Sequence, residues 1–520
     1  MARHPLEFKV DPVKHALSVT REQDFAAWYQ AVISEADMAE ESGVRGCMVI
    51  RPWGYGIWER MQKLLDERIK ATGHENCYFP LFIPLSYFEK EAEHVDGFAK
   101  EMAVVTHHRL IQKDGKLVPD PEAKLEEPLV VRPTSETVIG AAFSRWVQSW
   151  RDLPVLINQW ANVVRWEMRT RMFLRTAEFL WQEGHTAHAT VDEAMEETLK
   201  MLEVYRSFAE ECVALPVIAG EKPENERFPG AVATYSIEAM MQDGKALQAG
   251  TSHFLGTTFS QAQNIKFQNA EGQQELAQTT SWGVSTRMIG GLIMVHGDDD
   301  GLRVPPRVAP YQVVVVPMLR DTDEDAAILN YCGDLVAELN RQDVFREPVR
   351  ALLDRRSAKA ANKRWGWVKK GAPIIVEIGA RDLANGTVSV LRRDVLYDMQ
   401  GKLRPEFIRR EELAERVTAI LTSIQKDMLD TAKQRRDLNI DASILSLDGL
   451  REYFRAGSKP GWALVQWAKP TGAALDKVIE WLKGEKLTLR NVPSDAEAAD
   501  GLCIFTGDKA VERVLVGRSY

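Results

Sequence analysis

The chain has 520 residues, too many for one hydrophobic core, so about three domains of ordinary size are expected. With 45% hydrophobic and 27% charged residues and no low-complexity tract, it has the composition of a soluble globular protein. The net charge of −9 argues against a protein that is basic throughout, although a local basic surface remains compatible with it. No apolar run is long enough to span a membrane, and five scattered cysteines without metal-ligand or redox spacing indicate a reduced, cytoplasmic protein.

Two helices are predicted near the N-terminus. Thr20 and Gln23 have the spacing of a capping box, so the first helix is expected to begin at Thr20. The second helix covers residues 57–69, and Gly73 follows it where a C-terminal cap belongs. Residues 77–83 read as a strand broken by Pro80, which lacks an N–H and therefore suits a sheet edge or an interface.

The chain divides at residues 297–310, an acidic and then proline-rich stretch that is typical of a boundary. Before it, strand-like runs alternate with helices and polar motifs. After it, apolar runs such as Val313–Val316 and Ile374–Ile378 alternate with helical patterns and predict a small α/β domain. The three expected domains are residues 1–305, 306–408 and 409–520.

Four polar clusters before residue 300 are candidate binding sites, and the first is the run Arg132–Glu136. In an extended segment Thr134 and Glu136 point the same way, and a carboxylate beside a hydroxyl suits a substrate ammonium group. The alternative is a helix cap, with Thr134 or Ser135 starting a helix over residues 138–150. Both interpretations are open for this cluster alone.

The second cluster places Arg165, Glu167 and Arg175 around a short basic loop, which is followed by the run Phe179–His185. Arginine presents a planar fork of donors that grips phosphate oxygens and stays protonated, and an aromatic ring can stack on a base. These residue types suit a nucleotide site. The alternative is a surface strand pair with solvated ion pairs, which contribute little.

The third and fourth clusters are Gln248–His253 and Ser281–Arg287. The first of them combines small residues, which let a ligand approach the backbone, with polar groups on Gln248, Thr251 and His253. The other ends in an arginine just before a glycine-rich apolar helix, a position from which it can bind a distal phosphate. For the first of these clusters, the alternative is that His253 has a purely structural role. For the second, the alternative is that Arg287 is a charge on the surface of the helix.

Taken in order, these clusters resemble the class II aminoacyl-tRNA synthetases, and among them the prolyl-tRNA synthetases of the archaeal and eukaryotic-like type. GHENCYFP at residues 73–80 is similar to motif 1, whose proline lies at a dimer interface in the family. The stretch from RWE at 165 to HTAHA at 189 is similar to motif 2, and SWGVSTRMIGG at 281–291 to motif 3. RPTSET, WQEGH and QAGTSH resemble signatures of the proline enzymes, and the likeness covers essentially the whole chain.

The resemblance implies a multidomain α/β and α+β fold: a catalytic domain with an antiparallel sheet flanked by helices, an α/β anticodon-binding domain and a small α+β C-terminal domain. It implies a cytoplasmic homodimer with no membrane or DNA partner. The implied reaction activates L-proline with ATP and Mg²⁺ to prolyl-adenylate, then transfers proline to the 3′ end of tRNA(Pro). The proline carboxylate attacks phosphorus directly, so the enzyme would place substrates and neutralise charge.

The resemblance also implies a role for individual residues. Arg165, at the α-phosphate, and Arg287, at the γ-phosphate, would be catalytic, and Phe179 would stack on adenine. The proline-binding residues would be Thr134, Glu136, Arg165, Trp181, Glu183, Thr251, His253 and Ser285. The ATP-binding residues would be Arg165, Glu167, Arg175, Thr176, Phe179, Gln248 and Arg287.

The small α/β domain is similar to the family's anticodon-binding domain. This similarity implies that Glu377 and Arg381 contact the anticodon. Upstream, residues 346–370 contain nine Lys and Arg residues against one Glu and one Asp. Trp365 and Trp367 are interleaved with them, as expected of a surface on which bases stack. A solvated helix face is the alternative.

Two departures from the family pattern carry predictions. Relatives of this type often carry a C-terminal zinc site with four cysteines, whereas only Cys503 is present here, so no structural zinc is expected. Arg165 and Arg287 are about 120 residues apart, which leaves no room for an editing insertion and predicts some mischarging with alanine. In place of zinc, an apolar core would hold the C-terminal domain together, formed by Trp462, Val465, Trp467, Val478, Trp481 and Leu482. The terminal Tyr520 would pack toward the catalytic domain.

Two other functions fit the sequence less well. A sister synthetase for threonine, serine or glycine is disfavoured, because the motifs lack a Cys/His zinc set and the chain lacks an N-terminal coiled-coil arm. A catalytically inactive relative that only binds tRNA would be expected to have lost ATP-site residues, and these are present.

Overall fold

The computed structural model describes residues 16–92, 101–455 and 461–520. Contacts divide the chain into two compact units. The first comprises Met1–Met38, Arg51–Gly56 and His296–Met428, and the second comprises Ala39–Ile50, Ile57–Val295 and Leu429–Tyr520. No helix among the described residues is both long enough and apolar enough to traverse a membrane.

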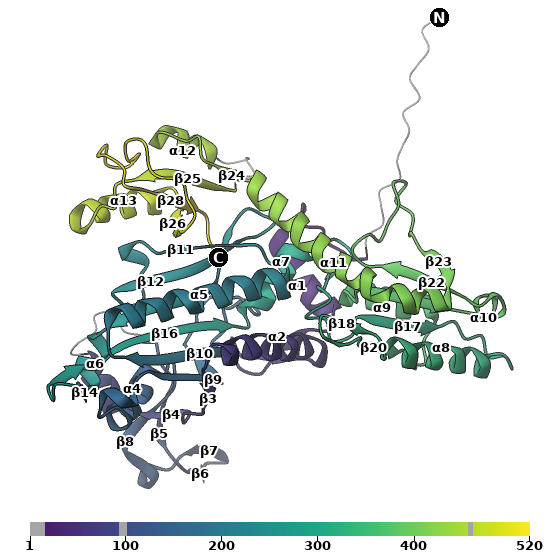
Figure 1. Cartoon of the computed structure of the whole chain (residues 1–520). Coiled ribbons are helices and arrows are strands. Elements are labelled where there is room, and N and C mark those ends of the chain that lie inside the picture. Colours follow the sequence, from purple (N-terminus) through teal and green to yellow (C-terminus); the bar gives the residue numbers. More distant parts are fainter. Residues whose placement is uncertain (1–15, 93–100, 456–460) are drawn as a thin grey trace, which may run out of the picture. The chain divides into compact units, whose positions relative to one another are not determined.

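The second unit is built on an eight-stranded sheet in the order β27-β11-β12-β13-β16-β10-β9-β3 (Figure 1). Neighbouring strands are antiparallel except β3 and β9, which are parallel. This confirms the expected antiparallel catalytic sheet. The strands are β3 (Glu75–Asn76), β9 (Val155–Val164), β10 (Glu178–His188), β11 (Val217–Glu221), β12 (Ala233–Met240), β13 (Ala246–Gly256), β16 (Gln278–Ser285) and β27 (Val492–Pro493).

Helix α5 (Val191–Val213) lies across one face of this sheet (Figure 1). It begins at a capping box, in which the side chains of Thr190 and Glu193 each accept a hydrogen bond from the other's backbone N–H at 3.2 Å. The Tyr205 hydroxyl donates to Gln182 Oε1 at 2.6 Å, and Ser252 Oγ donates to a carbonyl of the helix at 2.7 Å. Gln182 and Ser252 therefore face α5, and because side chains alternate along a strand, their neighbours face the opposite side.

The N-terminal helices are α1 (Phe25–Glu35) and α2 (Pro52–Ala71). Thr20 and Gln23 do exchange the expected hydrogen bonds, at 2.9 and 3.3 Å. The predicted start at Thr20 is nevertheless wrong, because Asp24 is the N-cap and its Oδ1 accepts from the N–H groups of the next turn. The second helix is confirmed, and Gly73 follows it with φ of +91°.

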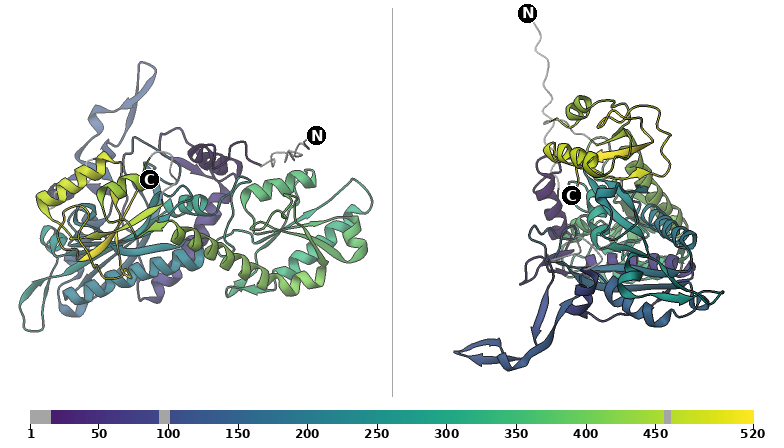
Figure 2. Two further views of the ribbon diagram at one scale, coloured as in Figure 1. Left: turned by 90° about the horizontal axis from the view of Figure 1, so that it is seen from above. Right: turned by 90° about the vertical axis from the view of Figure 1, so that its left-hand side faces the viewer.

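The strand predicted for residues 77–83, broken by Pro80, is confirmed only after the break, because residues 77–81 lie outside any strand. Strand β3 ends at Asn76 in the eight-stranded sheet, whereas β4 (Phe82–Pro84) belongs to a three-stranded sheet with β8 (Lys124–Val131) and β5 (Val104–His107). The chain changes sheets between them, around a proline that could not have donated to either ladder. Next to β5 and β8, strands β6 (Leu110–Lys113) and β7 (Lys116–Pro119) form a hairpin that extends outward from this sheet (Figure 2).

The remaining elements of this part are short. They are β1 (Ala39–Glu41), β2 (Met48–Ile50), α3 (Leu85–Ala92), α4 (Glu136–Trp146), α6 (Thr258–Gln263), β14 (Lys266–Gln268), β15 (Gln274–Leu276) and α7 (Arg287–His296).

The first unit contains the predicted small α/β domain. Its sheet has the order β20-β17-β21-β22-β23, with β17 parallel to both neighbours and the other pairs antiparallel. The predicted strands are confirmed. The elements are β17 (Val313–Pro317), α8 (Asp325–Leu339), β18 (Asp343–Val344), β19 (Glu347–Pro348), β20 (Ala351–Leu353), α9 (Ala360–Lys370), β21 (Ile374–Ile378), α10 (Ala380–Asn385), β22 (Thr387–Arg392) and β23 (Glu406–Arg409), followed by α11 (Arg410–Leu438).

The expected stacking surface on α9 is wrong for Trp367. Its side chain is 6% exposed, its ring packs edge-on against Trp53 at 5.6 Å, and its Nε1 donates to Asp354 at 2.8 Å. Several cations of the basic run are paired within this unit, including Arg364 with Glu377 at 3.0 Å. An indole buried in this way has no face on which a base could stack.

The C-terminal residues form a four-stranded sheet in the order β24-β25-β28-β26 with two helices. Val465, Trp467, Val478 and Leu482 form its core, with Trp481 packed against them, as predicted. Trp462 instead belongs to a separate apolar cluster with Met240 and Ala246 of the catalytic sheet. The elements are β24 (Ile440–Asp441), α12 (Leu447–Tyr453), β25 (Trp462–Trp467), α13 (Gly472–Gly484), β26 (Thr488–Leu489) and β28 (Glu512–Gly517).

This C-terminal part is joined to the eight-stranded sheet by backbone pairing. Strand β27 pairs with β11, and a Cβ on Gly220 would lie 2.0 Å from the carbonyl oxygen of Val492, so the contact requires glycine. The Tyr520 hydroxyl donates to Asp243 Oδ2 at 2.6 Å, and its backbone N–H donates to Ala246 at 3.2 Å. The prediction that the terminal tyrosine packs toward the catalytic domain is confirmed.

Candidate active site

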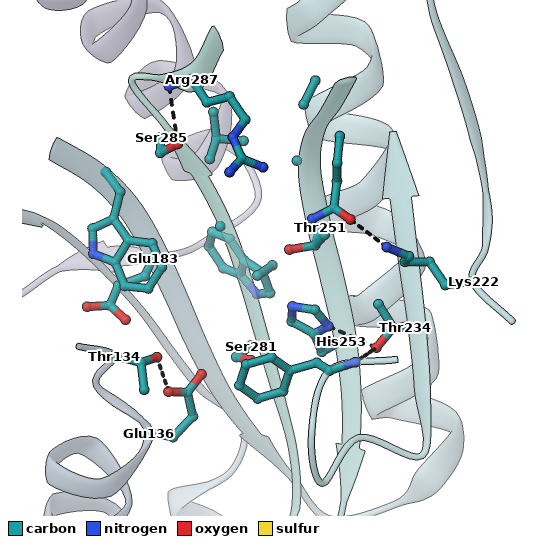
Figure 3. Close-up of a pocket in the computed structure, with 18 of the residues that line it drawn as sticks. Thr134, Glu136, Glu183, Lys222, Thr234, Thr251, His253, Ser281, Ser285 and Arg287 are labelled. Atoms are coloured by element: carbon teal, nitrogen blue, oxygen red, sulfur yellow. Dashed lines mark hydrogen bonds between the residues drawn. The ribbon is translucent and has the colours of Figure 1, made fainter. Parts of the chain in front are cut away.

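A cavity of about 330 Å³ lies on the face of the eight-stranded sheet that is turned away from α5 (Figure 3). Its walls come from β10, β13 and β16, from the starts of α4 and α7, and from the segment that joins β11 to β12. Eleven of the predicted site residues line it: Thr134, Glu136, Arg165, Phe179, Trp181, Glu183, Gln248, Thr251, His253, Ser285 and Arg287.

Strand register explains why residues so distant in sequence meet here. Glu183 on β10 lies opposite Gly283 on β16, which lies opposite Thr251 on β13. One pair of residues further along, His185, Ser281 and His253 form a second row across the same three strands. The sequence motifs are therefore adjacent strands that contribute alternate side chains to one surface.

The glycine of the WQEGH motif has a steric role. Gly184 lies opposite Trp282, and a Cβ at this position would lie 2.0 Å from the indole ring. The indole therefore occupies the space over Gly184, and it packs edge-on to Tyr205 of α5 at 6.2 Å. The packing of Trp282 between Gly184 and Tyr205 fills the α5 side of the sheet, behind the cavity.

The RPTSET segment supplies a hydroxyl and a carboxylate, as expected for an ammonium site. The Thr134 hydroxyl donates to the Glu136 carboxylate, and both residues are buried on the cavity wall. Ser135 stands at the N-cap position of α4 but makes no capping hydrogen bond; its Oγ donates to Glu183 Oε1 at 2.5 Å. The capping interpretation is therefore right about where the helix starts. It does not explain the side chains of Thr134 and Ser135, whose hydroxyls bond to carboxylates and not to the N–H groups of the helix.

Glu183 is held as an anion beside His185, whose Nε2 lies 2.9 Å from Glu183 Oε2. Burial alone would raise the pKa of Glu183, but hydrogen bonds from His185, Ser135 and Gln159 outweigh it and lower the pKa. Burial alone would lower the pKa of His185, but the hydrogen bond and charge of Glu183 raise it. The two side chains form a buried, hydrogen-bonded pair on the cavity wall, in which each favours the ionised form of the other.

His253 has the opposite electrostatic character. Burial, with smaller contributions from Lys222, His185 and Arg165, lowers the pKa of His253 to about 3. The ring is therefore neutral at physiological pH. Its Nδ1 lies 3.1 Å from Thr234 Oγ1, and its ring packs against that of Phe228 with centroids 4.7 Å apart.

Two arginines are anchored by their Nε atoms so that their other nitrogens face the cavity. Arg165 Nε donates to the Pro133 carbonyl at 2.8 Å, and its guanidinium lies over the rings of Phe179 and Trp181, at 5.7 and 5.3 Å. Arg287 Nε donates to a backbone carbonyl at 3.2 Å. Desolvation, followed by repulsion from neighbouring arginines, lowers the pKa of Arg287.

Three predicted ATP-binding residues lie outside this cavity. Glu167 and Arg175 are 4.0 Å apart across the loop before β10, and the Glu167 carboxylate accepts from the backbone N–H of Arg169 at 2.6 Å. Thr176 is buried beside them. The cavity does not include them, and their role remains a prediction.

Sequence reasoning missed the wall made by residues 222–228, between β11 and β12. Lys222, Glu226, Arg227 and Phe228 all line the cavity. In sequence, this stretch reads as a polar, proline-containing surface loop, and no motif distinguishes it. Its place in the site follows from the long-range order of β11, β12 and β13.

Comparison with known proteins agrees with this geometry. Residues 120–296 match the family profile described as tRNA synthetase class II core domain (G, H, P, S and T), and residues 312–419 match an anticodon-binding domain. A proline--tRNA ligase of Sphingomonas elodea is 75% identical over 98% of this chain and 100% of that protein. One from Novosphingobium aromaticivorans is 67% identical over 98% of this chain and 99% of that protein.

Solved structures give the same result. Prolyl-tRNA synthetase from Cryptosporidium parvum, complexed with L-proline and AMP, has 34% sequence identity and a TM-score of 0.85 over 97% of each chain. The same enzyme with halofuginone and AMPPNP has 35% identity and a TM-score of 0.85. The chain described here belongs to the prolyl-tRNA synthetase family of class II aminoacyl-tRNA synthetases.

Proposed function

We propose that the cavity on the eight-stranded sheet activates L-proline with ATP, and that the prolyl group is then transferred to the 3′ end of tRNA(Pro). One observation carries the site assignment: the carboxylate of the RPTSET segment and the arginine of the last motif lie at different ends of one cavity. Thr134 and Glu136 lie at the end far from Arg287 (Figure 3). An ammonium group suits the first end and a polyphosphate suits the second.

The proline amine would bind at Thr134 and Glu136, with Glu183 adding negative charge nearby. The pyrrolidine ring would lie against Trp181 and the neutral ring of His253, because neither carries a charge that an apolar ring would desolvate. Thr251 and Ser285 would complete this pocket. The Cryptosporidium enzyme, whose structure contains L-proline, supports the assignment by its similarity.

ATP would bind at the basic end. Repulsion between Arg165, Arg175 and Arg287 contributes to the lowered pKa of Arg287, and an anionic ligand relieves such repulsion. Phe179 would stack on adenine and Gln248 would donate to the nucleotide. Glu167, Arg175 and Thr176 would contact it from the loop before β10.

The chemistry needs positioned charge and no protein nucleophile. The proline carboxylate attacks the α-phosphorus in line, the bond to the bridging oxygen breaks, and pyrophosphate leaves. Arg165 would neutralise charge that grows on the α-phosphate, and Arg287 would hold the γ-phosphate. The terminal ribose hydroxyl of tRNA then takes the prolyl group and releases AMP.

Mg²⁺ suits this site because it binds through one or two carboxylates together with substrate phosphates. Glu167, half-buried beside Arg175, is the carboxylate that we assign to it. The ion would supply charge neutralisation to the triphosphate.

The anticodon-binding domain would contact tRNA(Pro) through Glu377 and Arg381. Arg381 is exposed on α10, whereas Glu377 is already paired with Arg364 at 3.0 Å, so a base would have to compete for its carboxylate. We further propose a cytoplasmic homodimer, with the exposed Tyr78 and Phe82 near motif 1 at the interface.

A pair of charge-neutralising variants tests the two ends of the cavity. In ATP–pyrophosphate exchange, Glu136→Gln should raise the KM for proline at least tenfold with the KM for ATP within twofold. Arg287→Met should do the reverse. Equal changes in both constants for each variant would contradict the assignment of the two ends.

A further inference from the structure

Lys222 is a nearly buried cation on the cavity wall that the reaction described so far does not use. It follows β11 directly, and its backbone N–H donates to Thr234 at 2.7 Å. Its side chain is only 6% exposed. Its Nζ donates to Gln248 Oε1 at 2.6 Å and lies 3.5 Å from Glu226 Oε2 (Figure 3).

This contact decides which way the Gln248 amide faces. An ammonium group has only donors, so the Gln248 atom beside it must be the carbonyl oxygen. The amide nitrogen of Gln248 is then directed away from Lys222, and Gln248 lines the cavity. A glutamine without such a partner could present either its oxygen or its nitrogen to a ligand, whereas this one is set to donate.

A second buried charge, on Glu238, acts on Lys222 electrostatically. Glu238 on β12 lies directly across from Gln248 on β13 and is completely buried. Its carboxylate accepts from Ser236 Oγ at 3.0 Å and from Arg490, of the C-terminal part, at 2.7 and 3.2 Å. Burial, with a smaller contribution from the charge of Arg490, lowers the pKa of Lys222, and the charges of Glu238 and Glu226 act against this.

The charges therefore alternate from the C-terminal part into the cavity: Arg490, Glu238, Lys222 and then the neutral amide of Gln248. A direct role for Lys222 as a phosphate ligand fits this arrangement less well. Its ammonium is already bonded to Gln248 and close to Glu226, and little of it is accessible.

We propose that Lys222 is a positioning residue of the adenylation reaction: it fixes the Gln248 amide so that the amide nitrogen donates to the nucleotide. The ammonium is held there by its hydrogen bond to Gln248 and by Glu226, whose Oε2 lies 3.5 Å away. The inference rests on the proposed nucleotide role of Gln248.

A double-mutant cycle tests the proposal. KM for ATP and KM for proline are measured by ATP–pyrophosphate exchange for Lys222→Met, Gln248→Ala and the double variant. Each single change should raise the KM for ATP about tenfold, the loss of one well-formed hydrogen bond, with the KM for proline within twofold. The double variant should resemble Gln248→Ala within about twofold, because Lys222 acts through Gln248.

The outcomes that contradict the proposal are distinct. Multiplied effects in the double variant, roughly a hundredfold by the same reasoning, would show that Lys222 contacts the nucleotide directly and would overturn it. An unchanged KM for ATP in Gln248→Ala would remove the nucleotide role of Gln248 from the proposed function, and the inference would fall with it.

Lys469→Met is the matched control. Its Nζ lies 3.5 Å from Glu221, the residue before Lys222, but the side chain is 45% exposed, so both KM values should stay within twofold. If Lys222→Met does not fold, Gln248→Glu gives an independent test, since it keeps an acceptor for Lys222 and loses the donor. It should raise the KM for ATP at least as much as Gln248→Ala, and a wild-type value would overturn the proposal.

Discussion

Replacing Arg490 by methionine tests how the C-terminal part is held to the catalytic sheet. Arg490 is 7% exposed and its partner Glu238 is fully buried, so the variant leaves a carboxylate without the two hydrogen bonds that Arg490 donates. Breaking one side of a buried ion pair costs about 3–5 kcal/mol, because the remaining charge is uncompensated. We expect a fall in Tm on the order of 10 °C if this unit unfolds cooperatively.

Thermal unfolding followed by tryptophan fluorescence measures this, with two comparisons. Arg455→Met removes an ion pair with Glu452 in which both side chains are about 70% exposed, and it should change the Tm by at most a degree or two. Combining Arg490→Met with Glu238→Gln should restore much of the loss, since the uncompensated carboxylate is removed. A wild-type Tm for Arg490→Met would show that this ion pair adds little to stability. A double variant less stable than the single one would show that the unpaired carboxylate is not the cause of the loss.

Four further outcomes follow from the site and the C-terminal core. Because the pKa of Glu183 is lowered and that of His185 is raised, their pair should stabilise the fold most at pH values between 4.5 and 6.5, the ordinary pKa values of the two groups. His185→Gln should therefore lower the Tm relative to wild type, and this difference should shrink as the pH rises through the raised pKa of His185. A Tm difference that is the same at every pH would contradict this. Because the pKa of His253 is about 3, its ring is neutral between about pH 5 and 8. His253→Gln should therefore change the KM for proline without changing how that KM depends on pH in this range. A pH-dependent step in the KM that is present in the wild type and absent in the variant would contradict this. Elemental analysis should find well under one zinc per chain, since Cys503 is buried in an apolar core, and one tightly bound equivalent would exclude that account. A charging assay should detect alanyl-tRNA, because loss of methylenes is discriminated by only about 1–3 kcal/mol, and its absence would count against a pocket without editing.

The sequence predicted the residues of the cavity well because its motifs lie on strands. The family resemblance indicated Phe179, Trp181 and Glu183, and alternation along β10 explains why these side chains share one face with His185. The sheet of the anticodon-binding domain was equally predictable, since its buried strands are continuous apolar runs.

The features that were missed depend on contacts between distant segments. Lys222 belongs to the site only because β11 lies beside β12, an order that local sequence does not contain. Trp367 looked suited to base stacking among its lysines, but Trp53 and Asp354 bury it. The start of α1 was misplaced because two capping motifs, at Thr20 and at Asp24, compete within five residues and local spacing cannot rank them.

ATP–pyrophosphate exchange, measured with each of the twenty amino acids and without tRNA, shows directly which amino acid the enzyme activates. Strong exchange with proline, and weaker exchange with alanine or cysteine, is the result that this account predicts. Stronger exchange with another amino acid would contradict it, as would no exchange at all from folded protein that still binds tRNA.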